Sequence, residues 1–150
     1  MNLSNKCIVV IDDTISILTF LRISLESMGA TFHGAATAAG GLSLCESTQP
    51  DLVILDLGLP DREGINILPR IKRLVKDGNL PVIVLTAHKE QEILDMAMEL
   101  GADAYITKPF VVDDLIKTIQ AQLQIRQDAH LKLVKREDNP ANISIRINKV

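Results

Sequence analysis

The sequence contains no tryptophan, and aromatic residues make up only 3% of its 150 residues. Proteins that bind single-stranded nucleic acid by stacking need several exposed aromatic faces, so a site of that kind is not expected here. The formal net charge is −3, and lysine and arginine form no sustained run along the chain. A general electrostatic attraction to nucleic acid or to anionic lipid is therefore not expected either.

Cysteine and long apolar stretches are also scarce. The two cysteines, Cys7 and Cys45, lack the CxxC spacing of a redox or zinc motif, which indicates a reduced, cytoplasmic compartment. No run of about 18 apolar residues is present to span a bilayer, and the apolar run that begins at Cys7 is too short for a secretory signal. We expect a soluble cytoplasmic protein without a membrane segment.

Five short apolar segments recur along the chain: CIVVI from Cys7, a weaker TFHGAA from Thr31, LVIL from Leu52, PVIVL from Pro81 and AYIT from Ala104. Three of them are continuously apolar, which is typical of strands that are covered on both faces in a parallel sheet. These segments predict five strands of a buried sheet.

Apolar residues at helical spacing lie between these segments. They recur every three or four positions in three stretches: Ile15, Leu18, Leu21, Leu25 and Met28, then Ile93, Ala97 and Leu100, and finally Leu115, Ile119 and Leu123. Two other stretches are less regular, because Gly40 and Gly41 should loosen a helix or delay its start, and Pro69 should kink a helix or belong to its first turn. Strand and helix alternate five times, which predicts an open α/β sheet with helices on both faces.

The last residues depart from this alternation. Asn139-Pro140 precedes NISIRIN, in which polar and apolar residues alternate as in a half-buried strand. We interpret residues 1–127 as one domain and residues 128–150 as a C-terminal tail or linker, with enough apolar residues to extend the last helix and a strand-like segment at its end. No recognition-helix pattern precedes Val150, so direct nucleic-acid binding by these residues is not expected.

Polar residues stand where the apolar segments end. The first segment is followed by Asp12 and Asp13, the third by Asp56, the fourth by Thr86 and the fifth by Lys108. Parallel strands all point the same way, so these side chains should meet at one edge of the sheet, where ligands bind. Taken alone, each aspartate is more simply a helix cap or a turn residue. All five residues at successive strand ends instead favour a shared site.

Three carboxylates in one crevice raise one another's pKa unless a cation compensates their charge. Oxygen ligands of this kind suit Mg²⁺, which commonly takes one or two carboxylates, further carbonyl or water oxygens, and a phosphate. One divalent ion and Lys108 would together balance the charge of the three aspartates. The residue types thus fit the transfer of a phosphoryl group, whose oxygens must be neutralised by a metal and a lysine.

Four motifs, VVIDD, DLVILDLGLPDREG, VIVLTA and AYITKPF, closely resemble the receiver domain of two-component response regulators, in the same order and with the same spacing, over roughly Lys6 to Gln127. The resemblance implies a flavodoxin-like α/β fold, a doubly wound, five-stranded parallel sheet of strand order 2-1-3-4-5 with helices on both faces. It also implies a phosphorylation-activated signalling switch that catalyses only its own phosphorylation and dephosphorylation and is not otherwise an enzyme.

By the same resemblance, Asp56 accepts a phosphoryl group from a phosphohistidine of a sensor histidine kinase or of a phosphotransfer protein. Mg²⁺ is the implied cofactor. Asp13 looks like the direct metal ligand and Asp12 like a residue that acts mainly through water, while Asp56 and the backbone carbonyl of Gly58 complete the protein's share of the ligands.

Lys108 and Thr86 are implied to contact the phosphoryl oxygens, and the Lys108–Pro109 peptide bond is implied to be cis. The family signals by moving the threonine toward the phosphoryl group while an aromatic residue three positions before the lysine, here Tyr105, rotates inward. This changes the face formed by the fourth helix, the fifth strand and the fifth helix. That face would control an output domain beyond residue 150 or a separate effector, and homodimerisation through it is a further hypothesis.

Two other interpretations start from the same residues. A haloacid-dehalogenase-type, Mg²⁺-dependent phosphatase would use Asp12 as its nucleophile, but it needs a second acid two positions later, where the sequence has Thr14. A flavin-binding module shares the fold but needs a phosphate loop rich in serine, threonine or glycine after the first strand. The DDTIS segment would instead place two negative charges against the phosphate, so both interpretations are disfavoured.

Overall fold

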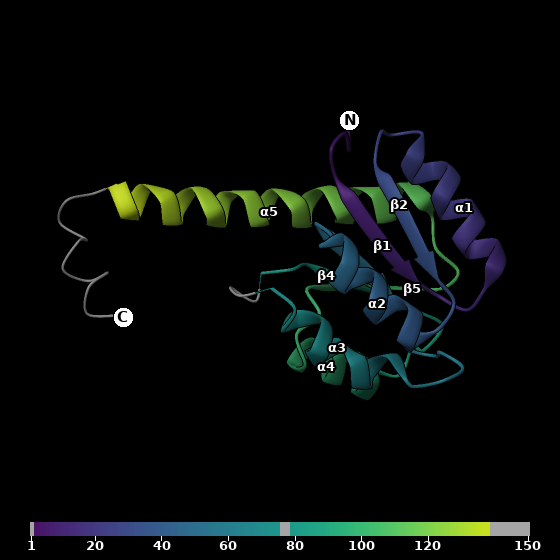
Figure 1. The fold of residues 1–150 in the computed structure, drawn as a ribbon. Helices are drawn as coiled ribbons and strands as arrows, with labels where there is room; N and C mark the ends of the chain where they lie inside the picture. Colours follow the sequence, from purple (N-terminus) through teal and green to yellow (C-terminus); the bar gives the residue numbers. More distant parts are fainter. Residues whose placement is uncertain (1, 76–78, 139–150) are drawn as a thin grey trace.

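The computed structural model describes residues 2–75 and 79–138 of the chain (Figure 1). Strands and helices alternate in these residues: β1 Cys7–Ile11, α1 Ile15–Glu26, β2 Thr31–Ala35, α2 Ala38–Thr48, β3 Leu52–Leu55, α3 Gly64–Lys72, β4 Val82–Thr86, α4 Gln91–Glu99, β5 Ala104–Thr107 and α5 Val112–Asp138. All strand pairs are parallel, and the strand order is β2-β1-β3-β4-β5. The doubly wound, flavodoxin-like sheet predicted from the sequence is confirmed.

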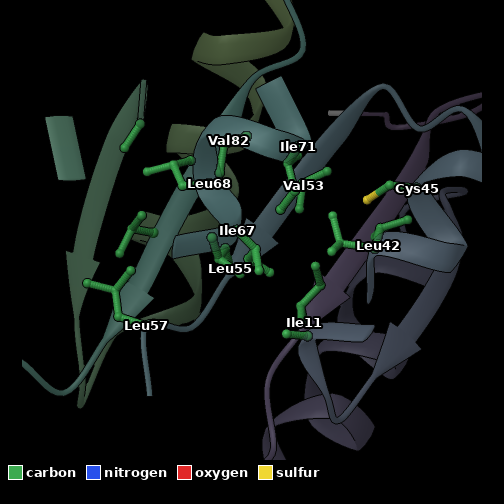
Figure 2. Packing of buried hydrophobic residues seen from close by; sticks show 14 of the residues in the cluster. Ile11, Leu42, Cys45, Val53, Leu55, Leu57, Ile67, Leu68, Ile71 and Val82 are labelled. Carbon is green, nitrogen blue, oxygen red and sulfur yellow. The ribbon is translucent and has the colours of Figure 1, made fainter. Parts of the chain in front are cut away.

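The central strands are buried on both faces because successive side chains enter two different cores. In β3, Leu52 and Ile54 belong to the core that α1 and α5 cover, whereas Val53 and Leu55 belong to the core that α2, α3 and α4 cover. Figure 2 shows the second of these cores, in which Leu68 of α3 packs among side chains from the strands. Burial on both faces explains why these segments are continuously apolar in the sequence.

Helix α2 does not start late, although its two glycines made a late start one expectation. It begins at Ala38, and the Thr37 side chain accepts a hydrogen bond from the N–H group of Gly40 at 3.0 Å. A Cβ atom at Gly41 would collide with the side chain of Ile11 on β1. Glycine at this position therefore lets α2 lie close to the sheet, and this packing offsets its low helix propensity.

Three further residues differ from the sequence pattern. Pro69 lies in the second turn of α3 rather than in the first, and the helix ends at Lys72 soon after it. Ile15 and Leu100, expected to face the core, are 66% and 37% exposed. Ile15 is the first residue of α1 and Leu100 is the cap residue after α4, so both lie at helix ends, where fewer neighbours cover a side chain.

Helix α5 continues without a break past residue 127, and Figure 1 shows its C-terminal half running beyond the sheet. Arg126 attaches this helix to the start of β3, because its guanidinium donates a hydrogen bond to the carbonyl oxygen of Asp51 at 2.8 Å. The strand-like segment expected near the C-terminus lies outside the described residues. In the described part of the chain, no helix is both long enough and apolar enough to cross a membrane.

Candidate functional site

The candidate site forms where the strands end. Ile11 at the end of β1 pairs in parallel register with Leu55 at the end of β3, so the next residues, Asp12 and Asp56, leave the sheet side by side. The N–H group of Asp56 donates to the carbonyl oxygen of Ile11 at 2.8 Å. Together with Asp13, these aspartates offer carboxylate oxygens that all lie within 4.8 Å of one another. The structure thus brings together the three carboxylates that the sequence placed at strand ends.

Lys108 reaches this cluster from the end of β5. Its Nζ lies 2.7 Å from Oδ2 of Asp12 and 3.4 Å from Oδ2 of Asp56. Its backbone N–H group donates to the carbonyl oxygen of Thr86 at 2.7 Å, and the Lys108–Pro109 peptide bond is cis, which confirms that expectation. Both aspartates are buried. One ammonium group therefore forms ion pairs with two buried carboxylates.

The Asp56 carboxyl group is the more weakly compensated of the two. Burial raises the pKa of Asp56, and the nearby charge of Asp12 adds to the rise. The N–H group of Gly58, 3.2 Å from Oδ1 of Asp56, and the ammonium group of Lys108 act in the opposite direction but do not cancel the rise. A second cation beside Asp56 would favour its ionised form, which is the form that can act as a nucleophile.

The other two aspartates differ in how accessible their carboxylate oxygens are to such a cation. Asp13 is exposed, and within residues 2–75 and 79–138 no hydrogen bond or ion pair engages its carboxylate. Asp12 is only 1% exposed; its Oδ2 pairs with Lys108, and its Oδ1 accepts the N–H group of Thr14 at 2.8 Å. The available oxygens are hard ligands, so their chemistry fits Mg²⁺.

The loop after Asp56 is shaped by its backbone and by a glycine. Gly58 and Glu63 form an isolated antiparallel bridge, and the N–H group of Gly64 donates to the carbonyl oxygen of Leu57 at 2.7 Å. A Cβ atom at Gly64 would collide with the backbone oxygen of Asp56, so glycine allows α3 to begin this close to the site. Gly58, whose carbonyl the resemblance assigned to the metal, is exposed in this loop.

Thr86 and Tyr105 lie on the two neighbouring strands β4 and β5, but within the described ranges their side chains make no hydrogen bond to the three aspartates. Thr86 is fully buried, and its hydroxyl oxygen accepts the N–H group of His88 at 3.0 Å. Tyr105 is 38% exposed.

Two features near the site have no signal in the sequence. The carboxylate of Asp61 accepts hydrogen bonds from the first two N–H groups of α2. Phe20 and Phe110 meet edge to face, with ring centroids 6.5 Å apart, in an apolar hollow of about 600 Å³ that Lys108 also lines. Both features join elements that are far apart in the chain, so only the folded structure reveals them.

Comparisons with known proteins agree with this geometry. The family model described as "Response regulator receiver domain" matches residues 8–120. The transcriptional regulatory protein KdpE of Mycobacterium tuberculosis is 40% identical over 117 residues, which cover 78% of this chain and 50% of that protein. Sporulation initiation phosphotransferase F of Bacillus subtilis is 32% identical over 124 residues, which cover 83% of this chain and 98% of that protein. The chain thus spans about half the length of the first relative and nearly all of the second.

Solved structures show the same architecture. A CheY-like response regulator receiver domain protein from Methanospirillum hungatei superposes with a TM-score of 0.79 at 32% identity, covering 84% of this chain and 99% of that one. The BeF3-activated DrrB receiver domain superposes with a TM-score of 0.71 at 30% identity, covering 79% and 97%. None of these similarities supports the phosphatase interpretation, in which Asp12 would be the nucleophile. Both carboxylate oxygens of Asp12 are in fact engaged, by Lys108 and by Thr14.

Proposed function

The chain belongs to the response regulator receiver family, and from this premise we propose that Asp56 accepts a phosphoryl group from a phosphohistidine of a partner protein. One observation carries the proposal. The Asp56 carboxylate lies within 4.8 Å of carboxylate oxygens of Asp12 and Asp13, and 3.4 Å from the ammonium group of Lys108. Receiver domains are signalling switches, so the phosphoryl group on Asp56 would be the signal.

The proposed transfer moves one phosphoryl group between two proteins. An oxygen of the ionised Asp56 carboxylate attacks the phosphorus atom, the P–N bond breaks, and its electron pair returns to the imidazole ring, which takes a proton from solvent. The carboxylate is already an anion and needs no general base, so the rate depends on position and charge neutralisation. Lys108 would neutralise the phosphoryl oxygens. The chain would catalyse only this reaction on itself and the later hydrolysis of the acyl phosphate.

Receiver domains bind Mg²⁺ at an acidic pocket, and the cluster of three aspartates is such a pocket. We assign Asp13, Asp56 and the backbone carbonyl of Gly58 as direct ligands, and Asp12 as a residue that acts through water. The exposed carboxylate of Asp13 and the two engaged oxygens of Asp12 support this division. When bound, the ion supplies positive charge that offsets the carboxylates and the phosphoryl oxygens.

We further propose that Thr86 and Tyr105 transmit the signal. The Thr86 hydroxyl, which accepts the N–H group of His88 in this structure, would turn to donate a hydrogen bond to a phosphoryl oxygen. The half-exposed ring of Tyr105 would then rotate inward. The phosphoryl group would favour this second arrangement because it bonds to the threonine only there. The surface formed by α4, β5 and α5 would change as a result.

A phosphohistidine donor needs a docking surface beside Asp56. Ile15 and Phe20 on α1 are 66% and 43% exposed, and Phe20 and Phe110 line the apolar hollow next to Lys108. We propose that a sensor histidine kinase or a phosphotransfer protein packs apolar side chains on this surface while its histidine reaches Asp56.

The proposed switch occupies residues 1–127, and residues 128–150 would connect it to an output domain, or the switch would act on a separate effector. The greater length of the KdpE relatives, which are named as transcriptional regulators, supports an output domain.

Met98, Tyr105 and Val111 are exposed on or near the α4-β5-α5 face and would also contribute to a homodimer interface. The two free cysteines fit a reducing cytoplasm.

Incubation with acetyl phosphate and Mg²⁺, followed by intact mass measurement, tests the proposal without a partner protein. The native chain should gain one phosphoryl group, and it should gain none when EDTA removes the metal. Asp56→Asn should gain none although it is folded by circular dichroism. Asp128→Asn changes an exposed aspartate on the far part of α5 and should behave like the native chain. An equal gain in Asp56→Asn would refute the assignment of the acceptor.

A further inference from the structure

Asp61 lies in the loop between β3 and α3, but its carboxylate caps a different helix. Oδ1 accepts the N–H group of Ala38 at 2.8 Å, and Oδ2 accepts the N–H group of Ala39 at 3.0 Å. These residues begin α2, and their N–H groups have no partner inside the helix. Thr37 caps the next N–H group, that of Gly40. Asp61 is exposed, yet its two backbone donors lower the pKa of its carboxyl group and keep it ionised.

The other hydrogen bonds of this loop are local, and Leu57 and Leu59 are buried in the core that α2, α3 and α4 cover. The bridge between Gly58 and Glu63 and the hydrogen bond from Gly64 to Leu57 close the loop on itself at the start of α3. These backbone contacts and the burial of Leu57 and Leu59 together define the shape of the loop. The side chain of Asp61 ties that shape to α2, which lies in a separate part of the chain 22 to 23 residues earlier.

The start of α2 is also connected to the acidic pocket. The carbonyl oxygen of Ala35, at the end of β2, accepts the N–H group of Asp12 at 2.9 Å, and Ala38 follows three residues later. The end of β2 therefore contacts the pocket at Asp12, and the start of α2, three residues further along the chain, contacts the loop at Asp61. Through this connection, Asp61 fixes the loop that carries Gly58 relative to the strand that carries Asp12.

We propose that Asp61 is a positioning residue for the metal site, because by capping α2 it holds the loop of residues 57–63, and with it the Gly58 carbonyl, against the acidic pocket. The inference rests on the proposed function, since it assigns the loop a part in Mg²⁺-dependent phosphorylation. Asp61 touches neither the phosphoryl group nor the ion. Its loss should therefore weaken Mg²⁺ binding and leave the phosphorylation rate at saturating Mg²⁺ near its native value.

Titration calorimetry with Mg²⁺ on Asp61→Ala tests the inference directly. The dissociation constant should rise about tenfold, as is typical when a residue that orients a metal ligand is removed. With acetyl phosphate as donor, the Mg²⁺ concentration at half-maximal rate should rise by the same factor. Asp61→Asn keeps one acceptor oxygen for two donors, so its affinity should lie between those of the native chain and of Asp61→Ala.

Two control variants separate positioning from simpler effects. Thr37→Ala removes the other cap of α2, so it should destabilise the same helix without changing Mg²⁺ affinity. Glu63→Ala removes a negative charge from the same loop and should also keep near-native affinity. All variants are compared at a temperature at which circular dichroism shows them folded.

Native affinity in Asp61→Ala would overturn the inference and leave the proposed function intact. An equal loss of affinity in Thr37→Ala would show that helix stability is responsible, and an equal loss in Glu63→Ala would show that loop charge is responsible. Either result also overturns the inference. A native chain that binds no Mg²⁺ would overturn the proposed function first, and the inference with it.

Discussion

The ammonium group of Lys108 and the carboxylate of Asp12, which are 96 residues apart in the sequence, lie 2.7 Å from each other in the structure. The same ammonium group is 3.4 Å from Asp56. The lysine thus compensates Asp12 more closely, and the pKa of Asp56 stays raised, chiefly by burial. A metal ion beside Asp56 would favour the ionised form of its carboxyl group. Because only the ionised form attacks phosphorus, phosphorylation would depend on the metal.

The raised pKa of Asp56 predicts a pH-dependent gain in stability for Asp56→Asn without metal. The folded state holds the Asp56 proton more tightly than the unfolded state does. The protonated Asp56 carboxyl group therefore contributes its full share to the free energy of unfolding below pH 3.8, its ordinary pKa. This contribution is lost as the pH rises through the raised pKa of Asp56 in the folded state. Asparagine carries no charge to bury. In EDTA, urea unfolding should show Asp56→Asn more stable than the native chain at neutral pH, and the difference should shrink toward about pH 4.

Asp128→Asn is the matched control for this experiment, because it neutralises an exposed aspartate far from the site, and it should show no such gain. A lower stability of Asp56→Asn at neutral pH in EDTA would contradict the electrostatic description of the pocket.

Lys108→Met should destabilise the metal-free chain. It removes the cation from two buried carboxylates, which should lower the free energy of unfolding by about 1–3 kcal/mol. Mg²⁺ should raise the melting temperature of this variant more than that of the native chain, since the ion supplies the missing charge. Lys89→Met changes an exposed lysine and should stay within about 0.5 kcal/mol of native. Equal responses of both variants would argue against a special role for Lys108.

Gly64→Ala should be costly, and Gly58→Ala should be tolerated. A Cβ atom at Gly64 would meet backbone atoms of Asp56 and Leu57, which cannot move aside easily, so a loss of about 1–3 kcal/mol is expected. A Cβ atom at Gly58 would meet nothing within 4 Å, so its effect should stay within about 0.5 kcal/mol. Chemical unfolding of both variants checks the contrast, and a tolerated Gly64→Ala would show that the loop is less tightly packed than described.

Cys45 should resist alkylation in the folded chain. Burial raises the pKa of its thiol to about 12, so almost no thiolate is present at pH 8. Burial also raises the pKa of Cys7, but its side chain is less buried, and a hydrogen bond with Thr48 acts in the opposite direction. Mass spectrometry after iodoacetamide treatment should find Cys7 modified before Cys45, and both modified quickly in urea. Equal rates in the folded chain would contradict the burial of Cys45.

The fold, and the cluster formed by the aspartates and Lys108, were predictable from the sequence because both follow from the geometry of parallel strands. Apolar runs located the strands, and the residues that follow parallel strands must gather at one edge of the sheet. Asp12, Asp13, Asp56 and Lys108 could therefore be placed together without any knowledge of side-chain packing.

The features that the sequence did not reveal depend on packing between distant elements. Asp61 resembles an ordinary turn residue, because its partners on α2 are 22 and 23 residues away. Gly41 resembles a helix breaker, yet its contact with Ile11 explains its place in α2. Local propensity carries no information about either contact.

Locating the phosphoryl group on the chain tests the central claim most directly. Borohydride reduces an acyl phosphate to an alcohol, so it converts a phosphorylated aspartate into homoserine, which peptide mass spectrometry can place in the sequence. After treatment with acetyl phosphate and Mg²⁺, homoserine is expected at position 56 alone, and nowhere when EDTA is present. Homoserine at position 12 or 13, or a phosphoryl group on a residue that borohydride leaves unchanged, would contradict the assignment of Asp56 as the acceptor.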